Sequence, residues 1–197
     1  MKMISDLLIT ALFTVFIQNL VLNSGLGISE AIRVSTKPGT FGKIAGMISG
    51  FSVVTSVICS ALNSAANFAS LPFAGKAAVY GGVLAAVYLL VALLLKLIFR
   101  ASDKLLGTLG IAALNTLVFA VPFINQSAAY SFADAIGSGI GAGIAFILAA
   151  ALISKGSDAL KKNENIPEAF KGTPAMLIYV GLLSLAFAGF ADSSLFI

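Results

Sequence analysis

The sequence has no histidine, a single cysteine and few charged residues, and each shortage excludes a kind of chemistry. Without histidine, the chain lacks the commonest metal ligand and general base. Cys59 has no second cysteine for an intramolecular disulfide, and one thiolate is too few to hold a zinc ion or an iron–sulfur cluster within this chain. No nucleophile–base pattern is present either. We therefore predict no catalytic residues and no metal site, and a soluble catalytic enzyme ranks a distant third among the functions considered.

Charged residues make up 10% of the chain, against about 25% in soluble proteins, and the mean hydropathy is +1.03. The formal net charge of +4 is modest, and the basic residues are spread over several connections. We therefore expect no nucleic-acid binding. The surplus of positive charge is instead expected to face membrane lipid with anionic headgroups.

Long apolar runs, separated by short charged connections, account for most of the chain. Each run has roughly 18 to 24 residues, and at about 1.5 Å per residue it can cross a hydrocarbon layer roughly 30 Å thick. We therefore predict an all-α, polytopic membrane protein with six transmembrane helices. The six runs are Leu7–Ile28, Ile44–Ala66, Ala77–Phe99, Leu105–Ile124, Ser131–Ile153 and Pro174–Ala191.

The first run is too long for the core of a cleaved signal peptide. Gln18, Asn19 and Asn23 also stand where a cleavage site made of small residues would be expected. We therefore expect this run to remain in the protein as a membrane helix.

Ten of the twelve basic residues fall in the first, third and fifth connections between the runs. The positive-inside rule places these three connections in the cytoplasm, so that both termini lie outside. The longest connection, about residues 154–173, is too short for a separate soluble domain. We therefore expect one integral membrane domain over residues 1–197.

The six runs divide into two sets of three, over about residues 1–100 and 101–197. Because three is an odd number, the second set enters the membrane in the opposite sense, so the halves are candidates for inverted repeats. The first run and the fourth each carry an asparagine, Asn19 and Asn115, shortly before a Leu-Val pair. This likeness supports the two three-helix repeats.

Amides within hydrocarbon must find partners, and two interpretations of Asn19, Asn23 and Asn115 remain open. They bond to a neighbouring helix and hold the bundle together, or they mark helices that are interrupted near the middle of the membrane. The segment 24–27 and Pro122 are the predicted break points. Interrupted helices expose half-helix ends that bind ions, substrates or cofactors.

The segment Gly137–Gly143 alternates glycine with other residues, and small residues at this spacing predict close packing of membrane helices. Asp134 precedes it and has two interpretations: a solvated residue at a helix end, or part of a mouth through which cations enter. Cys59 is interpreted as a small packing residue.

The chain resembles the membrane subunits of the Rnf electron transport complex and of the sodium-pumping NADH:quinone oxidoreductase, of the RnfA/NqrE type. The segment 167–172, Pro-Glu-Ala-Phe-Lys-Gly, and the run 181–190 are similar to family motifs. Asn19-Leu20-Val21-Leu22 and Asn125-Gln126-Ser127 also match the family. The resemblance covers essentially the whole chain. It implies six helices in two inverted halves with interrupted first and fourth helices, in the plasma membrane of a prokaryote.

The chain departs from the family at its redox site. In the family, one cysteine from each interrupted helix helps to hold an iron–sulfur centre between two homologous subunits. These positions are Ser29 and Thr116 here, and a neutral hydroxyl is a poor ligand where a thiolate is wanted. Lys96 stands where the family has an acidic residue. The resemblance therefore implies a retained scaffold, a lost cluster and no cofactor in this chain.

Two functions remain open from the sequence. The first is a membrane subunit of an Rnf/Nqr-type ion-translocating electron-transfer complex, or a divergent paralogue, itself non-catalytic. It would pair with a homologous subunit in a pseudo-twofold heterodimer, or form a homodimer, among other subunits. The alternative is a stand-alone inverted-repeat transporter of a small solute or cation. In either case Asn19, Asn23, Asn115 and Asp134 are the candidates for an ion or polar pocket.

Overall fold

The computed structural model describes residues 2–63, 68 and 70–191, and every regular element in these ranges is helical. Four stretches are long and apolar enough to span a membrane, and two shorter apolar helices accompany them. The prediction of an all-α fold is thereby confirmed for the described residues, and four of the six expected transmembrane helices reach the length that a membrane requires. The four stretches are Phe41–Asn63, Phe73–Leu97, Asp103–Ser127 and Phe132–Lys162, and the shorter helices are Met3–Phe16 and Thr173–Gly189.

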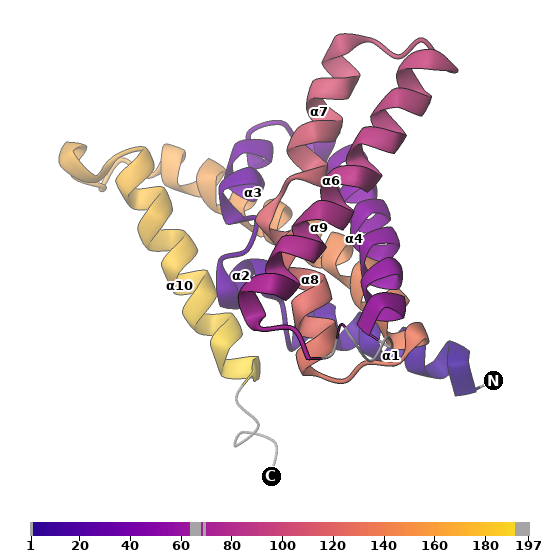
Figure 1. The fold of residues 1–197 in the computed structure, drawn as a ribbon. Coiled ribbons are helices and arrows are strands. Elements are labelled where there is room, and N and C mark those ends of the chain that lie inside the picture. The colour runs from indigo at the N-terminus through magenta and orange to yellow at the C-terminus, as the bar shows by residue number, and fades with distance from the viewer. Residues whose placement is uncertain (1, 64–67, 69, 192–197) are drawn as a thin grey trace.

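Helix α9 (Phe132–Lys162) is the central element of the bundle. Helices α1 (Lys2–Phe16) and α4 (Phe41–Asn63) pack against it most extensively (Figure 1). It is also contacted by α3 (Ile28–Ser35), α8 (Thr116–Ser127) and α10 (Thr173–Ala191). Helix α6 (Phe73–Leu97) packs against α4 and pairs with α7 (Asp103–Ala113). Helix α10 (Thr173–Ala191) packs against α9 and against the short helix α2 (Leu20–Ser24).

The two ends of α9 are held in place by contacts with different helices. At the first end, alternate glycines of the segment 137–143 face two different neighbours. A Cβ at Gly139 would lie 2.7 Å from the backbone nitrogen of Val53 in α4, and one at Gly141 would lie 2.7 Å from the carbonyl oxygen of Ala11 in α1. The prediction that these small residues allow close helix packing is confirmed.

At its other end, α9 continues nine residues beyond the predicted end at Ile153 and shortens the expected connection 154–173. Gly156 there receives the ring of Tyr179 from α10, and the Tyr179 hydroxyl donates to the Leu152 carbonyl at 3.1 Å. Lys161 and Lys162 in the last turn also favour helix over loop, since cations stabilise a helix C-terminus.

The first and fourth predicted runs are both interrupted. The run Leu7–Ile28 is divided among α1, α2 and α3 (Ile28–Ser35), and the run Leu105–Ile124 between α7 and α8 (Thr116–Ser127). The second predicted run ends at Ala66, which lies outside the described residues; α4 ends at Asn63.

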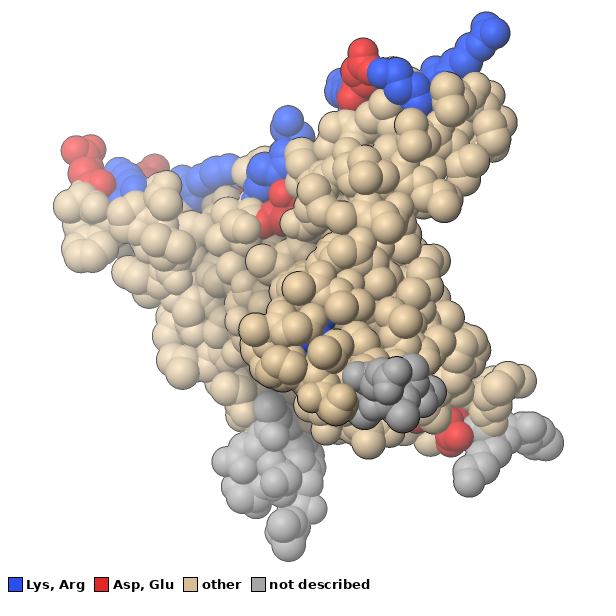
Figure 2. Space-filling model, in the orientation of Figure 1, with Lys and Arg blue, Asp and Glu red and all other residues tan. Residues whose placement is uncertain are grey.

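Most of the Lys and Arg side chains visible in Figure 2 lie along the upper edge of the molecule, from the connection between α9 and α10 to the one between α6 and α7, with some Asp and Glu side chains among them. The connections after α3, α6 and α9 all lie toward this edge in Figure 1. These are the three connections that the positive-inside rule assigns to the cytoplasm. The arrangement of the helices is therefore consistent with the alternation of charge along the chain.

Replacing Gly139 with alanine is expected to lower the midpoint of thermal unfolding, because the added methyl group forces α4 and α9 apart. Overpacking of this kind costs about 1–3 kcal/mol. Gly181→Ala in α10 is the matched control, since no atom lies within 4 Å of a Cβ there. Thermal unfolding of the detergent-solubilised protein measures both, and equal midpoints would contradict the close contact.

Candidate functional site

The first interrupted helix has two breaks. Helix α1 ends at Phe16, and Asn19 caps the five-residue helix α2 by accepting a hydrogen bond at Oδ1 from the backbone N–H of Leu22 at 3.1 Å. Gly25 then ends α2 in the left-handed conformation, with φ of 69°. Gly27, with φ of 74°, precedes α3. The break predicted over residues 24–27 is confirmed, and the earlier one at residues 17–19 was not predicted.

The second interrupted helix has one break, at Leu114 and Asn115. Asn115 has an extended backbone, and its Oδ1 accepts a hydrogen bond from the Leu117 N–H at 2.9 Å, which caps α8. The predicted break at Pro122 is wrong, because α8 continues through that residue. The helix restarts where an asparagine can cap it, and the proline costs α8 one backbone bond without ending it.

The two interrupted helices meet at these breaks. The Gly27 N–H donates to the Thr116 hydroxyl oxygen at 3.0 Å, across 89 residues of sequence. The Asn115 side chain lies against the same glycine, since a Cβ at Gly27 would be 2.8 Å from Asn115 Oδ1. The starts of α3 and α8 are therefore adjacent. This contact, between Gly27 and the pair Asn115 and Thr116, is called the break contact below.

The three predicted asparagines bond mainly to their own segments. Asn19 Nδ2 donates to the Val15 carbonyl at 2.9 Å, and Asn23 Nδ2 donates to the Ile17 carbonyl at 2.9 Å. Both carbonyls belong to the last part of α1 or the break after it. The interpretation of these side chains as markers of helix breaks is thereby supported over that of hydrogen bonds between neighbouring helices. Asn23 Oδ1 is buried and has no hydrogen-bond partner among the described residues.

Ser29 and Thr116 lie in the first turns of α3 and α8, and both are exposed. Their donors are neutral hydroxyls, and the Thr116 oxygen already accepts the Gly27 N–H. Cys59 lies elsewhere, buried in α4, and the described residues contain no group of three His, Cys, Asp or Glu that could hold a metal ion. The chemistry of these donors does not fit an iron–sulfur cluster, which takes thiolates.

Asp134 lies in the first turn of α9. Its hydrogen bonds join it to Ser131 and Thr10, and not to the residues of the break contact. Its carboxylate accepts the Ser131 N–H at 3.1 Å and the Thr10 hydroxyl of α1 at 2.6 Å. The side chain thus caps α9 and joins it to α1. In the connection before it, burial and the Asp134 charge raise the pKa of Tyr130. Its role in a mouth for cations stays a prediction.

Sequence reasoning missed a set of buried polar side chains between α4 and α8. Ser52 and Ser56 are at most 1% exposed, and their hydroxyls have no hydrogen-bond partner among the described residues. Asn125 accepts a bond from Ser138 at 2.7 Å, and its Nδ2 lacks a partner among them. A cavity of about 210 Å³ adjoins Ser56 and Asn125. The spacing of four residues between the two serines was the available signal, because it places them on one helix face.

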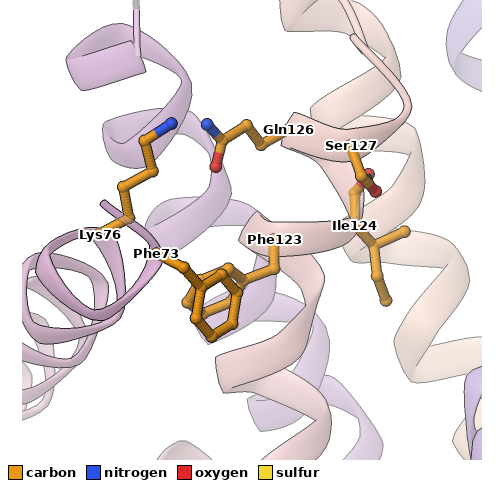
Figure 3. Close-up of a pocket in the computed structure, with 6 residues that line it drawn as sticks. All are labelled: Phe73, Lys76, Phe123, Ile124, Gln126 and Ser127. Carbon is orange, nitrogen blue, oxygen red and sulfur yellow. Dashed lines mark hydrogen bonds between the residues drawn. The ribbon is translucent and has the colours of Figure 1, made fainter. Parts of the chain in front are cut away.

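A larger cavity, of about 470 Å³, lies between the start of α6 and the end of α8 (Figure 3). The Phe73 and Phe123 rings pack with centroids 5.3 Å apart, and the Lys76 and Gln126 side chains point toward one another across the cavity. Gln126 also accepts a hydrogen bond from the Tyr80 hydroxyl at 3.0 Å. Since none of the predicted site residues lines this cavity, the break contact is the better candidate site.

The model of a protein family described as "Rnf-Nqr subunit, membrane protein" matches residues 7–192 of the chain. A subunit of the Na(+)-translocating ferredoxin:NAD(+) oxidoreductase complex from Acetobacterium woodii is 32% identical over 117 residues, which are 57% of this chain and 59% of that relative. A subunit of the Na(+)-translocating NADH-quinone reductase from Pseudoalteromonas translucida is 28% identical over 192 residues, 92% of this chain and 95% of that relative.

A subunit of the ion-translocating oxidoreductase complex from Colwellia psychrerythraea is 28% identical over 190 residues, 94% of this chain and 96% of that relative. The chain thus spans less than two thirds of the Acetobacterium protein that it matches, and nearly all of the other two.

Replacing Gly27 with alanine is expected to destabilise the protein more than Gly25→Ala does. Both glycines have positive φ, so each alanine costs about 1–2 kcal/mol of backbone strain. Only at Gly27 does the new methyl group also meet Asn115; a Cβ at Gly25 has no atom within 4 Å. Thermal unfolding in detergent compares the two variants. Equal destabilisation of the two variants would contradict the close contact between Gly27 and the Asn115 side chain.

Proposed function

The chain belongs to the Rnf-Nqr subunit family of membrane proteins, and from this premise we propose that it is a membrane subunit of an ion-translocating electron-transfer complex, or a divergent paralogue of one. The observation that carries the proposal is the break contact, which joins two interrupted helices through the Gly27 N–H and the Thr116 hydroxyl. The names of the relatives support the proposal, because two of these relatives align over more than nine tenths of this chain.

We further propose that the helices form two inverted three-helix repeats, over about residues 1–100 and 101–197. Each half would begin with an interrupted helix, followed by a long helix that packs at the centre of the bundle, α4 or α9. The positively charged edge would face the cytoplasm, and both termini would lie outside the plasma membrane of a prokaryote. The alternation of basic connections supports this orientation.

The proposed subunit has no iron–sulfur ligands of its own. Ser29 and Thr116 offer hydroxyls, which stay neutral at pH 7 and bind iron poorly in such sites. Thr116 instead stabilises the break contact. The half-helix ends would therefore either stabilise the arrangement of the helices or bind an ion or a small polar group. The Asn23 Oδ1, buried without a partner among the described residues, is a candidate ligand.

The proposed partners are a homologous membrane subunit, in a pseudo-twofold heterodimer, or a second copy of this chain, together with the other subunits of the complex. The relatives are named as subunits of multi-subunit complexes, which favours this function over a stand-alone transporter.

Iron content tests the loss of ligands. In the complex purified with its natural partners, Ser29→Ala and Thr116→Val are expected to leave iron per complex and the visible absorption unchanged, because neither hydroxyl binds iron. Ser127→Ala changes an exposed serine at the end of α8 and is the control for iron lost during purification. A loss of stoichiometric iron in either site variant, with the control unchanged, would contradict the proposal.

Uptake by vesicles separates the two functions. Vesicles that contain only this chain are expected to take up no more labelled sodium or small polar solute than empty vesicles, because a member of a complex acts with its partners. Uptake above that background, abolished by Asn19→Leu or Asn115→Leu but kept in Asn163→Leu, would favour the transporter. Asn163 is the control because it ends α9 at the surface.

A further inference from the structure

The positively charged edge contains a cavity of about 610 Å³ between α3, α4 and α7. Four cations line it: Arg33, Lys37, Lys43 and Lys104. Arg33 is paired with Glu30 through a hydrogen bond of 2.8 Å from its Nε. None of the three lysines has a carboxylate within ion-pairing distance among the described residues. Three uncompensated positive charges therefore surround one cavity.

Apolar side chains also line this cavity, among them Val34 and Ile44, which are buried, and Leu105. The remaining polar lining consists of Ser102 and three threonines, Thr36, Thr40 and Thr108. A cavity of this composition is suited to a ligand that is anionic at one end and apolar at the other. The positive-inside rule requires cations on this side of the membrane, but it does not require them to converge on a cavity with an apolar wall.

A second hollow, of about 410 Å³, continues from the first along α4 and faces α6. The two share Met47, and α7 borders both. The described residues that line the second hollow are all apolar apart from Gly50, and on α4 they extend from Met47 to Ile58. At about 1.5 Å per residue this length is about 16 Å, close to half of a hydrocarbon layer roughly 30 Å thick. It therefore matches the depth of one leaflet.

We propose that the cavity and the hollow form one binding site for an anionic phospholipid. The phosphate lies among Lys37, Lys43 and Lys104, and an acyl chain follows α4 past Gly50 toward Ile58. Anionic headgroups are the negative charges available at the cytoplasmic surface, and basic pockets between helices bind them. The lipid would fill the space between α4 and the α6–α7 pair. This site is separate from the break contact, and it rests on the proposed orientation of the positively charged edge toward the cytoplasm.

The headgroup and the acyl chain are tested by separate variants. The headgroup variant is Lys37→Gln/Lys43→Gln/Lys104→Gln, and its control Lys155→Gln/Lys162→Gln/Lys171→Gln removes the same charge from outside the cavity. The acyl-chain variant is Gly50→Phe, which places a ring in the hollow. Its control is Gly46→Phe, one turn away; a Cβ at either glycine has no atom within 4 Å.

The full chain in detergent is titrated with phosphatidylglycerol, with phosphatidylcholine and with inorganic phosphate, and native mass spectrometry counts the bound molecules. One phosphatidylglycerol is expected to bind more tightly than phosphatidylcholine. The affinity should fall about fivefold for each lysine replaced, and at least tenfold in Gly50→Phe, with both controls unchanged.

Three outcomes would overturn the proposal. Equal affinities for the two lipids would show that the lysines do not recognise the anionic headgroup. Binding of inorganic phosphate with no effect of Gly50→Phe would show a site for soluble anions. Displacement of the lipid by an acidic peptide at equal concentration, again insensitive to Gly50→Phe, would show a docking surface for a protein partner. Because each variant alters the surface of the bundle, a normal elution volume on gel filtration confirms that it folds.

Discussion

The structure depends on one constraint: a backbone that leaves its helix inside a membrane must find new hydrogen-bond partners, because no water is available to replace them. Both interrupted helices meet this constraint with side chains that are short and polar. Asn19 and Asn115 cap α2 and α8, and the Thr116 hydroxyl accepts the N–H of Gly27 from the other half of the chain. The breaks are thus stabilised partly by their own residues and partly by each other.

The packing of α9 makes that mutual stabilisation possible. Its alternate glycines bring α1 to one side and α4 to another with almost no side chain between the backbones. Helix α1 leads into the first break, and α4 packs along α8, which begins at the second. Close packing around α9 therefore positions the two breaks. A lipid between α4 and the α6–α7 pair would add to the same framework from the outside.

Apolar runs and isolated asparagines were enough to predict the membrane helices and to place the two interrupted ones. The position of the second break was predicted wrongly at Pro122, because proline is a local signal, whereas Asn115 restarts the helix by capping it. The contact of Gly27 with Asn115 joins distant segments and has no local pattern. The hydroxyls of Ser52 and Ser56, which have no hydrogen-bond partner among the described residues, were missed because serines on a membrane helix also serve as small packing residues.

The break contact makes different demands on its residues from those that an iron–sulfur cluster makes. A cluster ligand must be a thiolate, but the hydrogen bond that joins the two breaks needs only an acceptor on the residue that begins α8. The Thr116 hydroxyl supplies that acceptor at 3.0 Å and, unlike a thiolate, carries no charge. Replacing a ligand by threonine would therefore remove the electron-transfer site and keep the backbone geometry around it.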